Sequence, residues 1–279
     1  MANRLIKLPQ EGKAIVASDF HGNWADFETA ENRFLQLKNE NGATSATGAT
    51  YFIIAGDILD RGSDSERILD EVRTLKKTYP DNVHFLMGNH EWGYVELQRT
   101  GEVSHSPCDF YYAMQKKYGK VPEEFVGFLN DLPLAAITAN GIAIMHGGPC
   151  STLPNISRLD YANNLADNKL INSTVWADPS SKKSGYSPNA ERTRGDVMLA
   201  GALGLETYGD AALNEFLNNS GAQWLITGHG HRTDLDVLPR QMMISSSFKR
   251  AGPKAWVELE LGKYYSTKES LKDAVKSRY

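Results

Sequence analysis

Three short hydrophobic runs in the first third of the chain predict buried β-strands. They are Ile15–Ser18, Tyr51–Ala55 and Val83–Met87, and each is followed by a polar turn. Between these runs, apolar residues recur at intervals of three and four positions, which predicts two amphipathic helices. The apolar positions are Phe27, Ala30, Phe34 and Leu37 in the first helix, and Ile68, Leu69, Val72 and Leu75 in the second, before Pro80. Such strand–helix–strand units are parallel and right-handed, so we expect the three strands to end at one edge of a sheet.

Signals at the boundaries agree with this alternation of strands and helices. Asn23 is suited to cap the first helix, and Ser63–Glu66 has the spacing of a capping box for the second. Residues 41–50 are small and polar and predict a surface loop. The segment 109–131 has helical spacing of its aromatic residues, and Pro122 suits the first turn of a helix.

The second half of the chain gives weaker signals. Ala139–Gly141 lies between the runs Leu134–Thr138 and Ile142–Met145 and predicts a β-hairpin. Residues 151–200 are polar, and we interpret them as excursions over the face on which the strands end. The remaining predictions are a helix over 210–219, a strand at Gln223–Thr227 and strands near 241–246 and 255–260. The whole pattern predicts an α/β fold.

Composition narrows the class of protein. Of the 279 residues, 41% are hydrophobic and 23% are charged, which is ordinary for a soluble globular protein. We expect a single domain over 1–279, with its core at about 13–260 and a peripheral charged tail at 263–279. The net charge of −4 argues against a nucleic-acid partner. The sequence shows no apolar leader and no run of membrane-spanning length, so we expect a cytoplasmic protein without membrane contact.

Metal-ligating side chains follow the predicted strands. Asp19 and His21 come after the first strand, Asp57 after the second, and Asn89 and His90 after the third. Because open α/β sheets bind ligands at the carboxyl ends of their strands, we expect these side chains to share one crevice. A lone Gly-Asp or buried His is more often a turn, a cap or a core residue, but here the pattern occurs three times in order. Two later strands repeat it with His146, and with His229 and His231.

The ligand types limit the choice of metal. Carboxylate, amide oxygen and imidazole suit two divalent ions such as Mn, Fe or Zn, and we expect Mn. Cys108 and Cys150 have no metal-type spacing, and two cysteines are too few for a disulfide framework. Asp57 follows the predicted strand Tyr51–Ala55, the middle one of the three along the chain, and we expect its carboxylate to bridge the two ions.

The order of these motifs resembles the calcineurin-like metallophosphoesterases, and most closely the phosphoprotein phosphatase family in a bacterial-type form. The motifs are Asp19–Gly22, Gly56–Gly62, Gly88–Glu91, His146–Gly148 and a late His. Leu132–Ile137 and Trp176–Pro179 also resemble phosphatase sequences, and the ending Asn-His-Glu differs from the Asn-His-Asp of dinucleoside tetraphosphate hydrolases. The resemblance covers about residues 13–260 and implies two central mixed β-sheets sandwiched by helices.

The resemblance also implies two metal sites that share Asp57. One metal would be held by Asp19, His21 and Asp57, and the other by Asp57, Asn89, His146 and His229. The family's eukaryotic members have a single His at the last motif, whereas Gly228–His231 resembles the wider superfamily. There the second His, His231 in this chain, completes the first site.

Four further residues receive roles by resemblance. Arg61 would bind phosphoryl oxygens, and His90, oriented by Asp60, would protonate or orient the leaving group. Arg194 would be the second phosphate-binding arginine, with neighbouring Arg192 as the alternative. These roles predict direct attack by a metal-bridging hydroxide on a phosphate monoester, without a phosphoenzyme.

The expected substrate is a phosphorylated protein side chain, either phosphoserine, phosphothreonine or phosphotyrosine. The resemblance to the phosphatases and the lack of a Gly-rich nucleotide fingerprint support this prediction. One alternative is a small-molecule phosphoesterase that acts on dinucleoside polyphosphates or phosphodiesters. Another is a metal-binding interaction module without catalysis, against which the presence of Asp60, Arg61 and His90 argues.

Overall fold

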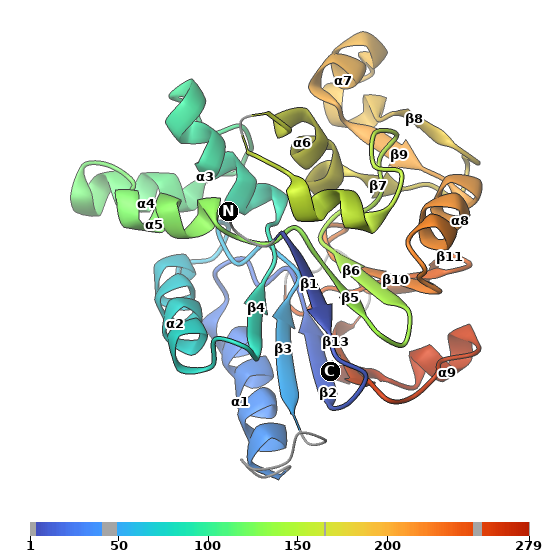
Figure 1. The fold of residues 1–279 in the computed structure, drawn as a ribbon. Helices are drawn as coiled ribbons and strands as arrows, with labels where there is room; N and C mark the ends of the chain where they lie inside the picture. The colour runs from blue at the N-terminus through green and yellow to red at the C-terminus, as the bar shows by residue number, and fades with distance from the viewer. Residues whose placement is uncertain (1–3, 41–48, 165, 248–252, 279) are drawn as a thin grey trace.

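Two mixed β-sheets occupy the centre of the computed structural model, which describes residues 4–40, 49–164, 166–247 and 253–278 (Figure 1). One sheet has the strand order β1-β5-β6-β10-β12-β11, and the other has the order β14-β13-β2-β3-β4. The first comprises β1 (Leu5–Leu8), β5 (Ala135–Thr138), β6 (Ile142–Met145), β10 (Trp224–Thr227), β11 (Asp234–Leu238) and β12 (Gln241–Met243). The second comprises β2 (Lys13–Ala17), β3 (Thr50–Ile54), β4 (Val83–Phe85), β13 (Lys254–Glu260) and β14 (Val275–Arg278).

The predicted arrangement of β2, β3 and β4 is confirmed. The three strands are parallel, with Ile15 opposite Phe52 and Phe52 opposite Val83. The helices α1 (Trp24–Glu40) and α2 (Ser65–Thr78) lie beside β3 and β4 (Figure 1). The carboxyl ends of these strands therefore share one edge.

The two predicted helix caps have different outcomes. The Oδ1 atom of Asn23 accepts a hydrogen bond from the backbone N of Asp26 at 3.3 Å, which confirms the cap of α1. The capping box at Ser63–Glu66 is wrong: α2 begins after Asp64, whose side chain makes no capping hydrogen bond. The carbonyl oxygen of Asp64 accepts the first helical hydrogen bond, from Ile68 N at 2.9 Å, and the backbone N of Asp64 donates to Gly22 O at 3.0 Å.

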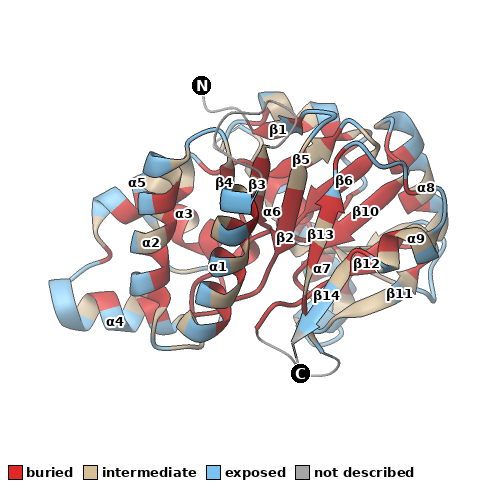
Figure 2. Cartoon of the chain, turned by 90° about the horizontal axis from the view of Figure 1, so that it is seen from below, coloured by how far each residue is buried: buried red, intermediate tan, exposed pale blue. Residues whose placement is uncertain are grey.

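The second sheet brings its own strand ends to the same region. β5 and β6 form the predicted antiparallel hairpin, and β6 pairs in parallel with β10. The inner faces of the two sheets share one hydrophobic cluster, in which Val16 and Ile53 of one sheet are grouped with Ile144 and Ile226 of the other. Figure 2 shows these strands buried between outer layers of helices whose exposed faces point outward. The fold is thus the pair of mixed sheets sandwiched by helices that the resemblance implied.

The segment 109–131 contains two helices, α4 (Asp109–Tyr118) and α5 (Glu123–Asn130). α4 ends at Gly119, whose φ of 74° is left-handed and readily adopted by glycine. Pro122 lies at the position just before α5 rather than within its first turn. The helix α3 (Asn89–Thr100) was not among the elements expected from the sequence, and it begins at the ligand motif itself.

Residues 151–208 contain more regular structure than the polar sequence suggested. β7, β9 and β8 form a separate small sheet, which lies with α7 in the upper part of Figure 1. The elements here are η2 (Ile156–Tyr161), α6 (Asn168–Trp176), β7 (Asp178–Pro179), β8 (Tyr186–Pro188), η3 (Ala190–Thr193), α7 (Val197–Leu203) and β9 (Glu206–Tyr208), followed by α8 (Asp210–Asn219).

The tail at 263–279 differs from its predicted peripheral role. It contains α9 (Lys268–Lys272) and β14, and β14 pairs antiparallel with β13 at the sheet edge. Tyr265 and Leu271 are buried because they pack into the cluster between the sheets. Most of the loop predicted at 41–50 lies outside the described residues. Among the residues that are described, no helix is both long and apolar enough to cross a membrane.

Candidate metal centre

The carboxyl ends of four strands bring predicted ligands together. Asp19 follows β2, Asp57 follows β3, His146 follows β6 and His229 follows β10, and all four side chains are buried. The Oδ2 atom of Asp57 lies 3.3 Å from Nε2 of His146 and 3.5 Å from Nε2 of His21. Asp57 therefore lies between ligands that come from the two different sheets.

The ligands fall into two groups on either side of Asp57. One group contains Asp19, His21 and His231, and its candidate ligand atoms all lie within 4.8 Å of one another. The other joins His146 and His229 to Asp57 within the same limit. Asn89, at the start of α3, adds an amide oxygen 3.0 Å from Nε2 of His146 and 2.8 Å from Nδ1 of His229. His231 thus lies with the first group, as in the two-histidine arrangement.

The chemistry of these groups fits divalent cations. Oδ1 of Asp19 and Oδ2 of Asp57 are buried and have no hydrogen-bond partner within the described chain. Burial, reinforced by the charge of Asp57, raises the pKa of Asp19 to about 6 although His146 opposes the shift. Two buried carboxylates this close to imidazoles favour a bound cation, which would offset the cost of their charge.

Backbone carbonyls orient two of the imidazoles. Nδ1 of His21 lies 2.8 Å from the carbonyl oxygen of Leu59, and Nδ1 of His146 lies 2.8 Å from that of Ala55. Because a carbonyl only accepts, these contacts place the proton on Nδ1 and leave Nε2 as the ligand atom. Hydrogen bonds of this kind commonly fix the ring of a metal-ligating histidine.

Left-handed backbone conformation is concentrated in this site. In the described part of the chain, every non-glycine residue with positive φ is a predicted site residue: Asp19, His21, Asp57, Asp60, Arg61, Arg194, His229 and His231. Such conformations cost about 1–3 kcal/mol each and persist only where the surrounding structure imposes them. Except for Arg194, which follows η3, these residues lie in the sharp turns after strands, and the turns aim their side chains at the expense of backbone strain.

Glu91 has a structural role that sequence analysis did not assign. Its carboxylate accepts hydrogen bonds from the backbone N atoms of Gly88, Asp57 and Ile58 at 3.0, 2.8 and 3.0 Å. A Cβ atom at Gly88 would lie 2.3 Å from Oδ1 of Asp57, so this close approach requires glycine. Burial and the charge of Asp57 raise the pKa of Glu91 to about 7. Glu91 ties the start of α3 to the turn that carries Asp57.

His90 and Asp60 form the predicted pair beside the candidate metal ligands. Nδ1 of His90 lies 2.6 Å from Oδ2 of Asp60, and its Nε2 lies 4.0 Å from Oδ2 of Asp57. Burial disfavours a charge on His90, but the carboxylates of Asp57 and Asp60 outweigh it and raise the pKa of His90. His105 and Tyr94, which lie outside every motif, also contact Asp60.

The two candidate arginines of residues 192–194 are placed differently. Arg192 forms two hydrogen bonds of 2.8 Å with the carboxylate of Asp178, and its Nη2 lies 2.7 Å from Nε2 of His229. Both residues are exposed, but among the interactions of the described residues Arg194 makes only a backbone hydrogen bond, from its N to the carbonyl oxygen of Ala190, where its φ of 54° turns the chain at the end of η3. This placement favours Arg192, the alternative, over the expected Arg194 as the second arginine of the site.

Arg61 lies on the same side as His90. Its φ of 68° follows the turn after β3, and its backbone N donates to Oδ2 of Asp109 at 3.1 Å. Burial lowers the pKa of His21, and the positive charge of Arg61 adds to that shift, whereas at His90 the same charge only opposes the rise in pKa that Asp57 and Asp60 cause. The guanidinium is therefore close to both groups.

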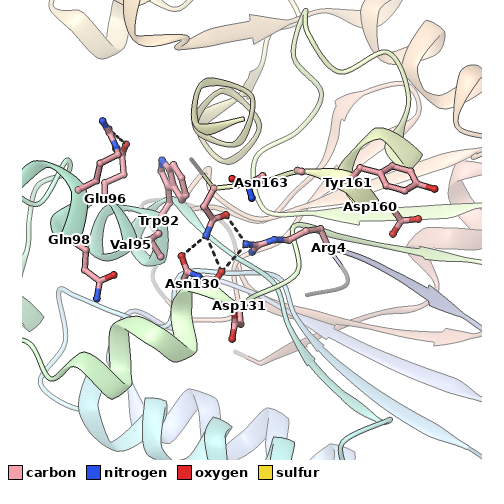
Figure 3. Close-up of a pocket in the computed structure, with 13 residues that line it drawn as sticks. Arg4, Trp92, Val95, Glu96, Gln98, Asn130, Asp131, Asp160, Tyr161 and Asn163 are labelled. Atoms are coloured by element: carbon pink, nitrogen blue, oxygen red, sulfur yellow. Dashed lines mark hydrogen bonds and ion pairs between the residues drawn. The ribbon is translucent and has the colours of Figure 1, made fainter. Parts of the chain in front are cut away.

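A cavity of about 490 Å³ lies elsewhere, between α3, the end of α5 and η2 (Figure 3). None of the described residues that line it is a predicted site residue. The Arg4 guanidinium lies at the wall of this cavity. It donates hydrogen bonds to the carbonyl oxygens of Leu132 and Asn130 and to Oδ1 of Asn164, at 2.5, 2.8 and 2.7 Å. This cavity is therefore separate from the candidate metal centre.

Comparisons with known proteins agree with this geometry. A curated relative, the serine/threonine-protein phosphatase BSL2 of Arabidopsis thaliana, is 26% identical over 232 residues, which cover 77% of this chain. The chain spans only 20% of the length of that relative.

Two solved structures have a similar fold. A Saccharomyces cerevisiae protein serine/threonine phosphatase with similarity to human phosphatase PP5 has a TM-score of 0.70 at 19% identity, over 99% of this chain and 83% of its own. A cold-active protein-tyrosine phosphatase of Shewanella sp. has a TM-score of 0.56 at 22% identity, over 94% of this chain and 78% of its own.

The match to a family model covers every candidate site residue. The model for calcineurin-like phosphoesterases matches residues 12–233, a range that begins before β2 and ends just after His231. It thus includes all the strand ends from which the candidate metal ligands project. On this match, the chain belongs to the calcineurin-like phosphoesterase family.

Proposed function

We propose that this protein is a metal-dependent phosphomonoesterase that dephosphorylates phosphorylated side chains of proteins, either phosphoserine, phosphothreonine or phosphotyrosine. The observation that carries the proposal is the position of His90, whose Nε2 lies 4.0 Å from Oδ2 of Asp57 while its Nδ1 is held by Asp60. A histidine held in this way beside the candidate metal ligands is suited to act on a leaving group. The metal ligands alone would not require such a pair.

The residues that would hold the metals form two sets that share Asp57. We assign Asp19, His21 and His231 to one ion, and Asn89, His146 and His229 to the other. Two divalent ions, which we expect to be Mn, would supply an acidified water and neutralise the charge of the phosphoryl oxygens.

The chain's own side chains perform the remaining steps. The proton on Nε2 of His90 passes to the ester oxygen as the bond from phosphorus to that oxygen breaks, and Asp60 holds the ring at Nδ1. Arg61 and Arg192 donate to the phosphoryl oxygens, where negative charge is held in the transition state. Asp178 orients the Arg192 guanidinium through its paired hydrogen bonds.

The names of the similar proteins support a protein substrate. The Arabidopsis thaliana relative and the Saccharomyces cerevisiae structure are named as serine/threonine phosphatases, and the Shewanella structure as a protein-tyrosine phosphatase. Within the family, we therefore group this chain with the phosphoprotein phosphatases rather than with phosphoesterases of small molecules.

A comparison of substrates tests this proposal. Rates on phosphoserine, phosphothreonine and phosphotyrosine peptides, diadenosine tetraphosphate and a phosphodiester are measured at one manganese concentration. We expect the highest kcat/KM on a phosphopeptide. If kcat/KM on the dinucleotide or the diester is well above the value on every phosphopeptide, the substrate is a small molecule and not a protein. Absence of hydrolysis of p-nitrophenyl phosphate with added manganese would instead favour an interaction module.

A further inference from the structure

Asp60 accepts hydrogen bonds from two histidines, although the proposed reaction uses only one of them. We propose that His105 is a positioning residue, which holds the Asp60 carboxylate and thereby aims His90 at the leaving group. This inference rests on the proposed phosphomonoesterase activity and extends it to a residue outside the sequence motifs.

The carboxylate of Asp60 is held on both oxygens. Oδ2 lies 2.6 Å from Nδ1 of His90 and 2.7 Å from Nε2 of His105. Oδ1 accepts from the hydroxyl of Tyr94 at 2.7 Å and from the backbone N of Phe110 at 2.9 Å. Four donors around a buried carboxylate prevent its rotation, so the direction of the bond to His90 is fixed.

The hydrogen bond from His105 to Asp60 leaves the other ring nitrogen of His105 buried without a partner in the described part of the chain. Since a carboxylate oxygen only accepts, Nε2 of His105 carries the proton in this hydrogen bond. The side chain of His105 is fully buried, and its Nδ1 atom has no hydrogen-bond partner within the described residues. A buried polar atom without a partner is unfavourable, and a residue used only for packing would not need to be histidine.

The helix α3 makes room for the ring of His105. A Cβ atom at Gly93 would lie 1.9 Å from Nδ1 of His105, so a larger residue would displace the ring. Glycine is unfavourable inside a helix, yet Gly93 lies in the interior of α3, one turn beyond Asn89 and His90. The glycine lets the ring of His105 lie beside that of His90, with ring centroids 4.3 Å apart and the ring planes tilted by 58°.

The short contacts identify this cluster as hydrogen-bonded rather than metal-binding. Two ligand atoms of one tetrahedral zinc ion would be about 3.3 Å apart, given metal–ligand bonds of about 2.0 Å. The Asp60 oxygen lies only 2.6 and 2.7 Å from the two imidazole nitrogens, which are hydrogen-bond distances. His105 therefore acts on His90 through Asp60.

The test compares two substitutions of His105 on two leaving groups. His105→Leu removes the donor, whereas His105→Gln retains an N–H that can reach Asp60. We expect His105→Leu to lower kcat on phenyl phosphate about 10- to 100-fold, the scale for loss of an orienting partner, with a much smaller loss on p-nitrophenyl phosphate. KM and metal content should not change, and His105→Gln should restore most of the activity.

Two further variants guard against a merely structural effect. Gly93→Ala should reproduce the dependence on leaving group, because its methyl group displaces the same ring. His84→Leu changes another buried histidine, which lies in β4 and contacts the carbonyl oxygen of Asp81 rather than Asp60. The ratio of the rate on phenyl phosphate to the rate on p-nitrophenyl phosphate should be the same in His84→Leu as in the unsubstituted protein.

A double-mutant cycle with His90→Asn decides the mechanism. If His105 acts through His90, His105→Leu should cause no further loss of rate in the His90→Asn background. Equal losses on both substrates, a full further loss in that background, or unchanged rates in His105→Leu would overturn the inference. A lack of activity of the unsubstituted protein on both substrates would instead reject the proposed function.

Discussion

Two regions contribute to the same candidate site but hold their side chains in different ways. One is the ends of β2 and β3, and the other is the segment around η3. At the strand ends, Asp19 and Asp57 are buried and held by left-handed turns of the backbone. In the η3 segment, Arg192 has a side chain that is 29% exposed and is held through the side chain of Asp178. The difference suggests a rigid metal-binding side and a more adaptable substrate-binding side. Substitutions should therefore affect metal content on the first side and catalysis on the second.

The largest effect is expected from Asp57→Asn. The substitution removes the charge from the carboxylate that lies between the two ligand groups, so neither ion would keep its full set of ligands. Metal analysis of the purified variant and its rate on p-nitrophenyl phosphate should both show a near-complete loss. If the variant retained both metals and full activity, Asp57 would not bridge the ions, and the distinction between a metal-binding side and a substrate-binding side would be wrong.

The next effect in size is expected from His90→Asn. His90 contacts the metal-binding side through Asp57 but is proposed to act on the leaving group. Turnover on phenyl phosphate should fall by roughly two to four orders of magnitude, the usual scale for a general acid, while the metal content is unchanged. Loss of metal from the variant would show instead that His90 is a ligand.

Arg192→Ala should reduce kcat by about 10²- to 10³-fold, as observed for loss of a single donor to developing charge, without loss of metal. Arg194→Ala is the matched control, because this residue is exposed two positions away. The control should retain nearly full activity in the same assay. A larger loss in Arg194→Ala than in Arg192→Ala would restore the original expectation for Arg194.

A smaller effect is expected from His231→Ala, since His231 is only half-buried, whereas His229 is buried. We expect both His231→Ala and His229→Ala to lose metal, with the greater loss for His229→Ala. The measurement is metal content after dialysis against a fixed concentration of free manganese. A fully metallated His229→Ala protein would contradict its assignment as a ligand.

The same contrast explains how much was predictable from the sequence. The ligands at strand ends follow from local pattern, because a buried strand that stops at a polar turn places the next side chains at the sheet edge. This applies to Asp19, Asp57 and His146, and to the parallel order of β2, β3 and β4. The family resemblance then supplied the roles of Asp60 and His90.

Other parts of the site depend on contacts between distant segments. The contact of His105 with Asp60 spans 45 positions, and the contact of Arg192 with His229 spans 37. No local pattern marks His105, and the sequence offered Arg192 only as the alternative to Arg194. Gly93, in the interior of α3, is a sequence signal for close packing at His105. The strand β14 was missed for a similar reason, since its pairing with β13 is decided by tertiary packing.

The central claim is that the two ligand groups hold two divalent ions through a shared Asp57. The most direct test is elemental analysis of the 279-residue chain after reconstitution in excess manganese and removal of unbound metal. The account predicts that the ratio approaches two ions per chain, and that it falls in Asp57→Asn but not in His90→Asn. A ratio of one or less in the unsubstituted protein would contradict it.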